Sequence, residues 1–330
     1  MSRIYLITGA SGHLGSAIIQ ELLKTKQTIY ALALPNDKHI PKGVHIIEGD
    51  ITSKNSLTPF FNHNNDKEKV LIHCAGVISI QTKIDPLLYE VNVVGTQNIL
   101  DLSLEYGISK VIHVSSVHAI KELPHGQIIK EADTFNKEEV IGAYAKTKAE
   151  ATQYALGMAK KGLNISIVHP AGIIGPYDRG KGHFTSLIVE FCTDKSVVGI
   201  KGGYDLVDVR DVASGIISAV NKGEKGNCYI LSNRHFSVKE LLNLLADLIK
   251  KKRIRFFLPI WLAKISAPLA EVYYKLMRKP PLFTSYSIYT LGSNSNFSNE
   301  KAKKELGYTT RPMEETLLDT IEWLKRIDRI

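Results

Sequence analysis

The sequence contains little cysteine and no long apolar run. Its three cysteines are Cys74, Cys192 and Cys228, and their spacing fits neither a disulfide framework nor a cysteine zinc site. No apolar stretch approaches the ~20 residues that a helix needs to cross a bilayer, and we recognise no signal peptide. We therefore expect free thiols, no transmembrane segment and a cytoplasmic location.

Acidic side chains are fewer than basic ones. Lys and Arg total 42 against 33 Asp and Glu, which gives a formal net charge of +9. No nucleic-acid-binding motif accompanies this charge, so we expect a solvated surface and no nucleic-acid partner. The basic run 250–255 and the basic-apolar segment 253–279 are interpreted as a solvated edge of a substrate lobe rather than a membrane contact. No His, Asp and Glu cluster has metal-ligand spacing, so we predict no metal site.

Short β-branched runs alternate with amphipathic stretches in the first half of the chain. This alternation predicts an α/β fold, a doubly wound parallel sheet with helices on both faces. We assign residues 1–170 to this domain and 171–330 mainly to a smaller, interleaved C-terminal substrate lobe, some of whose segments return to the sheet. The predicted strands are 3–8, 28–34, 45–48, 70–73, 110–114, 163–169 and 228–231. The predicted helices are 14–24, 86–106, 141–161, 209–220, 238–250 and 314–326.

A glycine-rich turn joins the first predicted strand to the first helix. Gly9 allows the tight turn, Gly12 lets the backbone approach a pyrophosphate, and Gly15 permits close packing of the helix. The helix N-terminus presents free N–H groups to the anion, and His13 is expected to pack near the phosphates. The spacing differs from the usual Gly-x-Gly-x-x-Gly. Its position still predicts a dinucleotide site in a Rossmann fold.

The position expected to bind the adenosine ribose carries neither an acid nor an arginine. It falls near Leu34, roughly 20 residues beyond the glycine turn, and we interpret Asp37 as a turn residue. A carboxylate that would repel a 2′-phosphate is absent, and Lys38 lies nearby. We therefore predict NADP(H) or NAD(H), with a preference for NADP(H).

A tyrosine and a lysine stand four residues apart at the start of a predicted helix. This spacing puts Tyr144 and Lys148 on one helix face. An ammonium group nearby favours phenolate and would lower the pKa of the tyrosine from its usual ~10. Ser115 and Ser116 end the preceding strand, where hydroxyl groups would face the same crevice.

Together these motifs resemble the extended short-chain dehydrogenase/reductase family over nearly the whole chain. The resemblance implies a catalytic Ser116, with Ser115 as the second choice, acting with Tyr144 and Lys148. Asp50-Ile51 resembles the pair that contacts adenine, residues 73–76 resemble the strand-end turn beneath the cofactor, and residues 169–176 resemble the segment near the nicotinamide. The implied cofactor-binding residues are Gly9, Ser11, Gly12, His13, Leu14, Gly15, Asp50, Ile51, Cys74, Ala75, Gly76, Tyr144, Lys148 and His169.

Departures from the family pattern indicate the branch. Val117 and His118 stand where nucleotide-sugar dehydratases carry acids, Gly172 where epimerases carry asparagine, and Tyr204 where they carry arginine. Loss of such a clamp removes charge-assisted bonds to a diphosphate. The remaining pattern is similar to the dihydroflavonol-4-reductase and 3β-hydroxysteroid dehydrogenase branch. Arg179 and Lys181 are cations that could substitute for the clamp.

Other residues are assigned structural or secondary roles. His118 is a candidate substrate contact, while His73 and His113 are expected to be hydrogen-bonded core residues, and Asp208 is expected to cap a helix. The substrate pocket is expected among the loops 77–83, 117–124 and 177–186. Helices 86–106 and 141–161 are a candidate homodimer interface.

The predicted function is that of an NAD(P)(H)-dependent dehydrogenase or reductase. It would interconvert a carbonyl and an alcohol on a small, largely uncharged substrate by a Ser-Tyr-Lys mechanism. A nucleotide-sugar epimerase or dehydratase is the first alternative. A non-catalytic dinucleotide sensor is the second.

Overall fold

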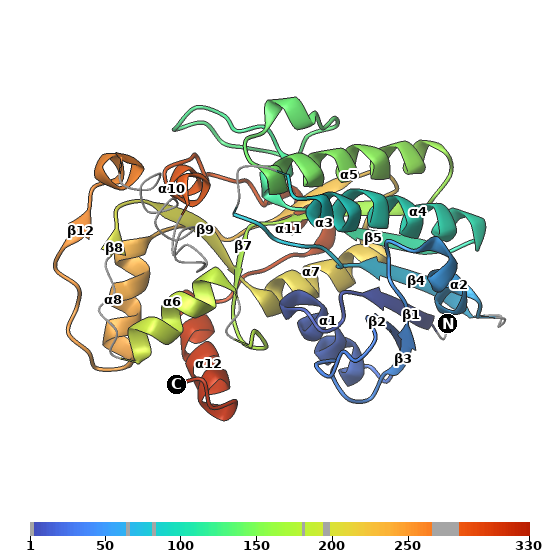
Figure 1. Ribbon diagram of the computed structural model, residues 1–330, viewed down its shortest axis with the longest axis horizontal. Coiled ribbons are helices and arrows are strands. Elements are labelled where there is room, and N and C mark those ends of the chain that lie inside the picture. Colours follow the sequence, from blue (N-terminus) through green and yellow to red (C-terminus); the bar gives the residue numbers. More distant parts are fainter. Residues whose placement is uncertain (1–2, 64–66, 81–83, 180–181, 194–198, 266–283) are drawn as a thin grey trace.

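A seven-stranded parallel sheet forms the centre of the molecule (Figure 1). The computed structural model describes residues 3–63, 67–80, 84–179, 182–193, 199–265 and 284–330. The strand order β10-β6-β5-β4-β1-β2-β3 confirms the predicted doubly wound α/β fold. The strands are β1 (Arg3–Thr8), β2 (Thr28–Ala33), β3 (His45–Glu48), β4 (Glu68–His73), β5 (Lys110–Val114), β6 (Ile165–Pro170) and β10 (Cys228–Leu231).

Helices cover both faces of this sheet. On one face α1 (His13–Lys24) packs against α7 (Val209–Lys222), and on the other α4 (Thr96–Glu105) packs against α5 (Ala143–Lys160) (Figure 1). The central strands are therefore apolar on both sides, as parallel strands usually are. The strand order reverses at β1, which lies between β2 and β4. Open α/β sheets bind ligands at such a switch point, beyond the carboxyl ends of the strands.

The predicted helix 86–106 contains a turn of π-helix. Helix α3 (Pro86–Tyr89) continues into η2 (Glu90–Gly95) and then α4. Within η2, Asn92 accepts a hydrogen bond from Val77 N at 2.8 Å and donates to Val77 O at 2.9 Å. It also donates to Thr147 Oγ1 at 3.1 Å. The π-turn thus ties the segment after β4 to α5, an arrangement that hydrophobic periodicity does not reveal.

Several predicted boundaries move in the structure. Strand β4 begins two residues before the predicted 70–73, because Glu68 and Lys69 already pair with β1. Strand β6 begins two residues after the predicted start at 163 and continues through Pro170. Four short helical segments escaped prediction because they span three or four residues, namely η1 (Lys54–Leu57), α2 (Thr58–Phe61), η3 (Val117–Ala119) and η4 (Lys137–Glu139).

Later parts of the chain form a smaller lobe beside the sheet. Its strands are β7 (Gly172–Ile174), β8 (Gly199–Ile200), β9 (Gly203–Asp208), β11 (Arg234–Ser237) and β12 (Phe257–Leu258). Its helices are α6 (His183–Cys192), α8 (Val238–Leu248), α10 (Ser285–Leu291) and α12 (Met313–Arg326). Leu242 of α8 and Leu317 of α12 are fully buried in its core. Strand β10 and α11 (Glu300–Leu306) return to the large sheet.

An ionic network joins the two parts of the chain. Asp208 caps α7, as predicted, by accepting a hydrogen bond from Arg210 N at 2.7 Å. Burial alone would raise the pKa of Asp208, but hydrogen bonds from Arg210 hold it below its usual value. Arg210 also pairs with Asp319 of α12, and Arg311 Nε donates to Asp211 Oδ1 at 2.8 Å. These bonds hold α12 against the start of α7.

Candidate active site

The glycine turn is held by close contacts of its backbone. Gly9 has a φ of +70°, and a Cβ there would lie 2.7 Å from Ala75 N. A Cβ on Gly15 would lie 2.1 Å from Gly9 O, so the first turn of α1 packs directly on the loop. Only glycine fits these two positions without a shift of backbone. The turn and the segment after β4 therefore meet at the switch point.

The middle of the same turn is open. A Cβ on Gly12 would meet only Gly9 O, at 3.2 Å, and Gly12 is exposed. No described side chain caps α1, so its first N–H groups, beside Ser11 and Leu14, are available to an anion. The His13 ring instead hydrogen bonds Pro176 O at 2.9 Å, and burial lowers its pKa. This cradle fits the pyrophosphate of a dinucleotide.

The predicted adenosine end lies at the ends of β2 and β3. Leu34 is 57% exposed, and Asp37 lies in a turn, where it accepts a hydrogen bond from His39 N, as predicted. Asp50 accepts hydrogen bonds from Thr52 N at 2.9 Å and from Thr52 Oγ1 at 2.8 Å. Ile51 is buried against Gly95 of η2. Contacts within the chain thus hold the side chains of Asp50 and Ile51.

The segment after β4 lines the floor of the crevice. Thr8 Oγ1 accepts a hydrogen bond from Ala75 N at 3.2 Å and pairs with His73 Nδ1 at 2.7 Å. Burial raises the pKa of the Cys74 thiol to about 12, so this thiol stays protonated. A Cβ on Gly76 would lie 3.4 Å from Lys148 Nζ. The structure therefore brings the predicted cofactor floor next to the predicted catalytic lysine.

The two serines after β5 point in different directions. Ser115 Oγ lies 2.6 Å from Thr152 Oγ1 of α5, so it is engaged within the core. Ser116 Oγ accepts a hydrogen bond from His118 N at 3.2 Å and lies beside the Tyr144 phenol. This arrangement favours Ser116 over Ser115 as the hydroxyl that faces the site.

Tyr144 and Lys148 lie on the first turns of α5, where Lys148 is buried and Tyr144 is half-buried. Burial raises the pKa of Tyr144 to about 12, while Ser116 acts in the opposite direction. Lys148 donates to Val114 O at 2.9 Å, and burial lowers its pKa to about 8. The pKa of this phenol is therefore raised and not lowered as predicted, because burial has the largest effect.

Two histidines stack at the strand ends below these residues. His73 hydrogen bonds Thr8 and Thr96, as predicted, and burial lowers its pKa to about 3. His113 is fully buried, but neither ring nitrogen has a hydrogen-bond partner among the described residues, so the prediction of a hydrogen-bonded core residue is wrong. It stacks on His73 instead, with ring centroids 5.6 Å apart.

His169 lies closer to the serine. Its Nδ1 hydrogen bonds Ser116 O at 3.0 Å, and its ring stacks on Phe135 with centroids 5.2 Å apart. Burial lowers its pKa to about 4, so the ring is neutral at pH 7. The side chain is completely buried. His169 therefore holds the backbone carbonyl of Ser116 in place. The predicted contact of His169 with a cofactor stays a prediction.

The smaller lobe adds a tyrosine that the sequence did not reveal. The ring of Tyr286 on α10 packs on Gly142, whose φ is +103° and where a Cβ would lie 2.1 Å from that ring. Its hydroxyl is buried and has no hydrogen-bond partner in the described part of the chain. The His118 ring lies near both tyrosines, with centroids 6.2 Å from Tyr144 and 6.5 Å from Tyr286. Only the fold brings Tyr286 to the site, since no local motif marks it.

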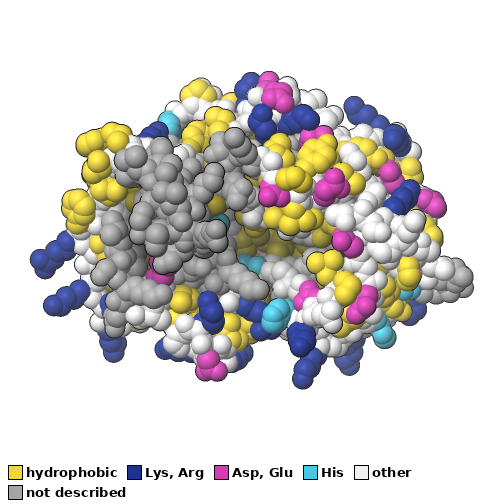
Figure 2. Space-filling model, in the orientation of Figure 1, with side chains coloured by type: hydrophobic (Ala, Val, Ile, Leu, Met, Phe, Trp, Pro, Cys, Tyr) yellow, Lys and Arg dark blue, Asp and Glu magenta, His cyan; other side chains and the backbone are white. Residues whose placement is uncertain are grey.

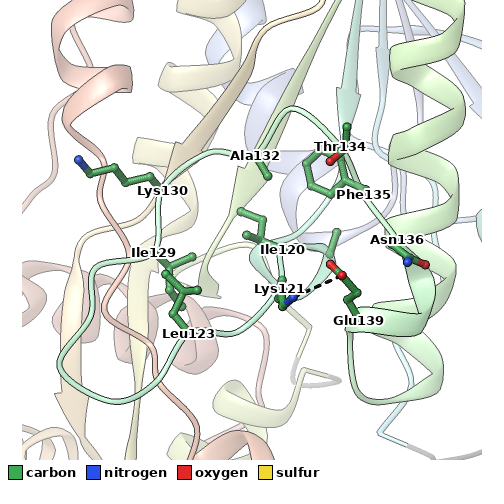
Figure 3. Close-up of a pocket in the computed structure, with 11 residues that line it drawn as sticks. Ile120, Lys121, Leu123, Ile129, Lys130, Ala132, Thr134, Phe135, Asn136 and Glu139 are labelled. Carbon is green, nitrogen blue, oxygen red and sulfur yellow. Dashed lines mark ion pairs between the residues drawn. The ribbon is translucent and has the colours of Figure 1, made fainter.

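Apolar side chains line a surface hollow and a cavity. Figure 2 shows a hollow near the centre of one face, with hydrophobic side chains along it. A cavity of about 170 Å³ lies between residues 119–123 and 129–139. Figure 3 shows apolar side chains that line it, such as Ile120 and Phe135, with the Lys121–Glu139 ion pair beside them. Of the other predicted pocket loops, residues 81–83 and 180–181 lie outside the described residues. Within the described part of the chain, no group of three or more His, Cys, Asp or Glu could bind a metal.

Comparison with known proteins agrees with this geometry. A model of the NAD dependent epimerase/dehydratase family matches residues 5–232. The chain is 28% identical to "Sterol demethylase protein B" of Methylococcus capsulatus, over 97% of this chain and 98% of that protein. It is 27% identical to a putative dihydroflavonol 4-reductase of Synechocystis, over 98% and 95% of the two chains. It is 29% identical to the decarboxylating sterol-4-alpha-carboxylate 3-dehydrogenase of Saccharomyces cerevisiae, over 98% and 99%.

Solved structures share the fold over the full length. The crystal structure of gox2253 is 26% identical, with a TM-score of 0.83 and coverage of 100% of this chain and 99% of that one. The Thermus thermophilus UDP-glucose 4-epimerase complex with NAD is 21% identical, with a TM-score of 0.74 and coverage of 98% and 99%. The fold and these relatives define an NAD-dependent enzyme of the extended short-chain dehydrogenase/reductase type, as predicted. The chain belongs to the NAD dependent epimerase/dehydratase family.

Proposed function

We propose that the protein is a dehydrogenase or reductase that interconverts a secondary alcohol and a ketone on a largely uncharged substrate. The observation that carries the proposal is the placement of Ser116 beside Tyr144, with Lys148 one turn further along α5 and next to Gly76. Gly9, Gly12 and Gly15 would hold the pyrophosphate, and Lys148 the nicotinamide ribose. The bound nicotinamide supplies or accepts the hydride.

The side chains of the site transfer the proton and orient the substrate oxygen. In reduction the Tyr144 hydroxyl gives its proton to the carbonyl oxygen, and in oxidation the phenolate removes the proton of the alcohol. Ser116 orients that oxygen by donating a hydrogen bond. Lys148 places a positive charge near the phenolate that forms. With a pKa of about 8, Lys148 is still largely protonated at pH 7.

The surroundings of Gly172 and Tyr204 support an uncharged substrate. A Cβ on Gly172 would lie 2.9 Å from Asp205 O and 3.2 Å from Phe184 Cε2, so a longer side chain has no room there. The Tyr204 hydroxyl donates to Ser287 O at 3.3 Å, and its ring meets Phe184 edge-on. Neither position offers a charged group to a diphosphate. The described Arg179 is exposed, and Lys181 lies outside the described residues.

The relatives suggest a polycyclic substrate. The names of two of them refer to sterols and one name refers to a dihydroflavonol. Both compound types carry a ring hydroxyl or ketone on an uncharged polycyclic skeleton. We propose this substrate class for the present chain, with Tyr286 and His118 contacting it.

Cofactor-coupled assays test the proposal directly. Absorbance at the nicotinamide band is followed with dehydroepiandrosterone and either oxidised cofactor, and with dihydroquercetin and either reduced cofactor. We expect turnover of at least one compound and no better than millimolar binding of UDP-glucose, since few bonds would compensate desolvation of the diphosphate. Micromolar binding of UDP-glucose, or its conversion to UDP-galactose without net cofactor change, would favour an epimerase. Cofactor binding with no turnover of any compound would favour a sensor.

A variant of the catalytic tyrosine tests the mechanism. Tyr144→Phe should lower turnover roughly 100-fold or more, with cofactor affinity retained, because only the proton donor is lost. Tyr154→Phe is the matched control, since this phenol on the same helix donates to Asp101 Oδ1, at 2.5 Å. Parent turnover in Tyr144→Phe would refute the assigned role.

The finer features of the enzyme are also proposals. The exposed Leu34 and the nearby Lys38 support a preference for NADP(H), which competitive titration of NADPH and NADH would test. Exposed Leu87 of α3 and Ile141, two residues before α5, belong to the segments predicted to form a dimer interface and support a homodimer. Light scattering that gives a mass near 36.7 kDa at micromolar concentration would exclude the dimer. The three free cysteines support a reducing, cytoplasmic location.

A further inference from the structure

The segment 256–265, which follows α8, has two apolar faces, and one of them packs against the lobe. Strand β12 is followed, after Pro259, by helical residues 260–265. Ile260 and Ala263, one turn apart, face inward and pack with Ile288 of α10. A Cβ on Gly292 would lie 2.5 Å from Ile260 Cδ1, which shows how closely this face is seated. The inward side chains therefore complete a small core of the lobe.

The outward face of the same segment is also apolar. Phe256 is 68% exposed, Trp261 62%, Ile265 63% and Leu262 38%. They are four of the thirteen large hydrophobic side chains exposed among the described residues, and they fall within ten consecutive positions. A surface helix ordinarily presents polar side chains to water. The described part of the chain provides no cover for these four.

Basic residues flank these apolar side chains in the sequence. No acidic residue occurs between positions 248 and 265. Lys252, Arg255 and Lys264 are exposed and form no ion pair with a described residue, whereas Arg253 pairs with Asp247. In Figure 2, hydrophobic and Lys or Arg side chains lie next to one another at the end of the molecule where Figure 1 places β12.

The sequence predicted a solvated edge here; against that prediction, we propose that this surface docks on the interface of an anionic lipid bilayer. Exposed aromatic and aliphatic side chains would enter the headgroup region, and the flanking cations would pair with lipid phosphates and carboxylates. A symmetric contact with a second copy is disfavoured, because a two-fold axis brings the same cations face to face. The proposal goes beyond the proposed reaction and does not depend on the substrate. We call this surface the docking strip, and it consists of Lys252, Arg255, Phe256, Trp261, Leu262, Lys264 and Ile265.

Flotation of the full chain with vesicles tests the proposal. We expect flotation with vesicles that contain phosphatidylserine, little with phosphatidylcholine alone, and weaker binding as salt rises. Lys252→Glu with Arg255→Glu should reduce partitioning about fivefold or more for each cation. Trp261→Ser with Ile265→Ser should reduce it further. Equal flotation of these variants and the parent, or no flotation of the parent, would overturn the proposal.

A spectroscopic measurement separates insertion from mere electrostatic attraction. Brominated lipids should quench emission from Trp261, and Trp261→Phe should abolish that quenching. Trp323 provides a constant background, because its Nε1 donates to Asp178 O at 2.9 Å within the lobe. Leu318→Ser and Lys304→Glu are matched controls on α12 and α11 and should bind like the parent. If Trp261→Ser halves the mass in solution and leaves vesicle binding unchanged, the strip is a contact between copies and the proposal fails.

Discussion

Gly12 and Gly15 belong to one glycine-rich turn, yet the two positions should respond differently to substitution. Gly12 has φ −72° and ψ 167°, which any residue adopts, and a Cβ added there meets only Gly9 O, at 3.2 Å. Gly12→Val should therefore leave the fold intact. We expect it to cost about 1 kcal/mol of unfolding free energy, because valine is a poor N-cap residue.

The same valine should abolish most cofactor binding. Its methyl groups would project into the open cradle over the first N–H groups of α1, where the pyrophosphate is proposed to bind. We expect the dissociation constant of NADH or NADPH to rise about 100-fold, which corresponds to ~2.7 kcal/mol. Fluorescence titration of the reduced cofactors measures this change, and urea unfolding measures the change in stability.

Gly15→Ala is the contrasting variant. Its methyl group would lie 2.1 Å from Gly9 O and 2.8 Å from Gly9 C, so α1 must move away from the loop. We expect a loss of about 2 kcal/mol or more of unfolding free energy, as for an overpacked core. Parent affinity for NADH in Gly12→Val would refute the position of the cradle. Equal destabilisation by both substitutions would refute the distinction between an open and a packed glycine.

Three further predictions concern buried polar groups. Tyr286→Phe should raise KM for a ketone substrate severalfold. Its unfolding free energy should stay within about 1 kcal/mol of the parent, because the Tyr286 hydroxyl has no described hydrogen-bond partner to lose. Tyr289→Phe on the same helix is the control. Ser116→Ala should lower kcat, whereas Ser115→Ala should lower mainly stability, since its hydroxyl pairs within the core; steady-state kinetics and thermal unfolding separate the two. Burial raises the pKa of Asp205 to about 7, so Asp205→Asn should gain stability relative to the parent as pH rises from about 4 to 7, measured by urea unfolding.

The sign of the Asp205 prediction follows from proton linkage. A carboxyl whose pKa is higher in the folded state than in the unfolded state binds its proton more tightly when folded. Its contribution to stability is therefore complete below the unfolded pKa of about 4 and is lost as pH rises through about 7. A difference between variant and parent that stays constant from about pH 4 to 8 would contradict this reasoning. An unchanged KM in Tyr286→Phe, or equal losses of kcat in the two serine variants, would contradict the other two predictions.

The sequence predicted those parts of the site that follow one another in the chain. Gly9 to Gly15 could be recognised because a turn between a strand and a helix has its own spacing, and Tyr144 with Lys148 because both lie on one helix. The choice of Ser116 over Ser115 depended on register, and the hydrogen bond between Ser115 and Thr152 gives it a physical basis.

Other features depend on contacts between distant residues. Tyr286 reaches the site only because α10 packs on Gly142, and no local pattern marks that contact. The His113 ring has no hydrogen-bond partner in the described structure. The sequence could not predict this, because hydrogen bonding depends on which side chains surround the strand. The short strands of the smaller lobe span too few residues for a hydrophobic period to appear.

The position of β10 has a consequence for how the chain folds as it is made. Strand β6 is complete at Pro170, yet the strand that covers its outer edge is β10, at Cys228–Leu231. During synthesis β6 therefore presents an unpaired edge until the ribosome has released about sixty more residues, at ~5–20 residues per second. An unpaired strand edge can form backbone hydrogen bonds with another chain and so promotes aggregation. A nascent chain stalled before Cys228 should consequently be a better substrate for chaperones than one stalled after Leu231.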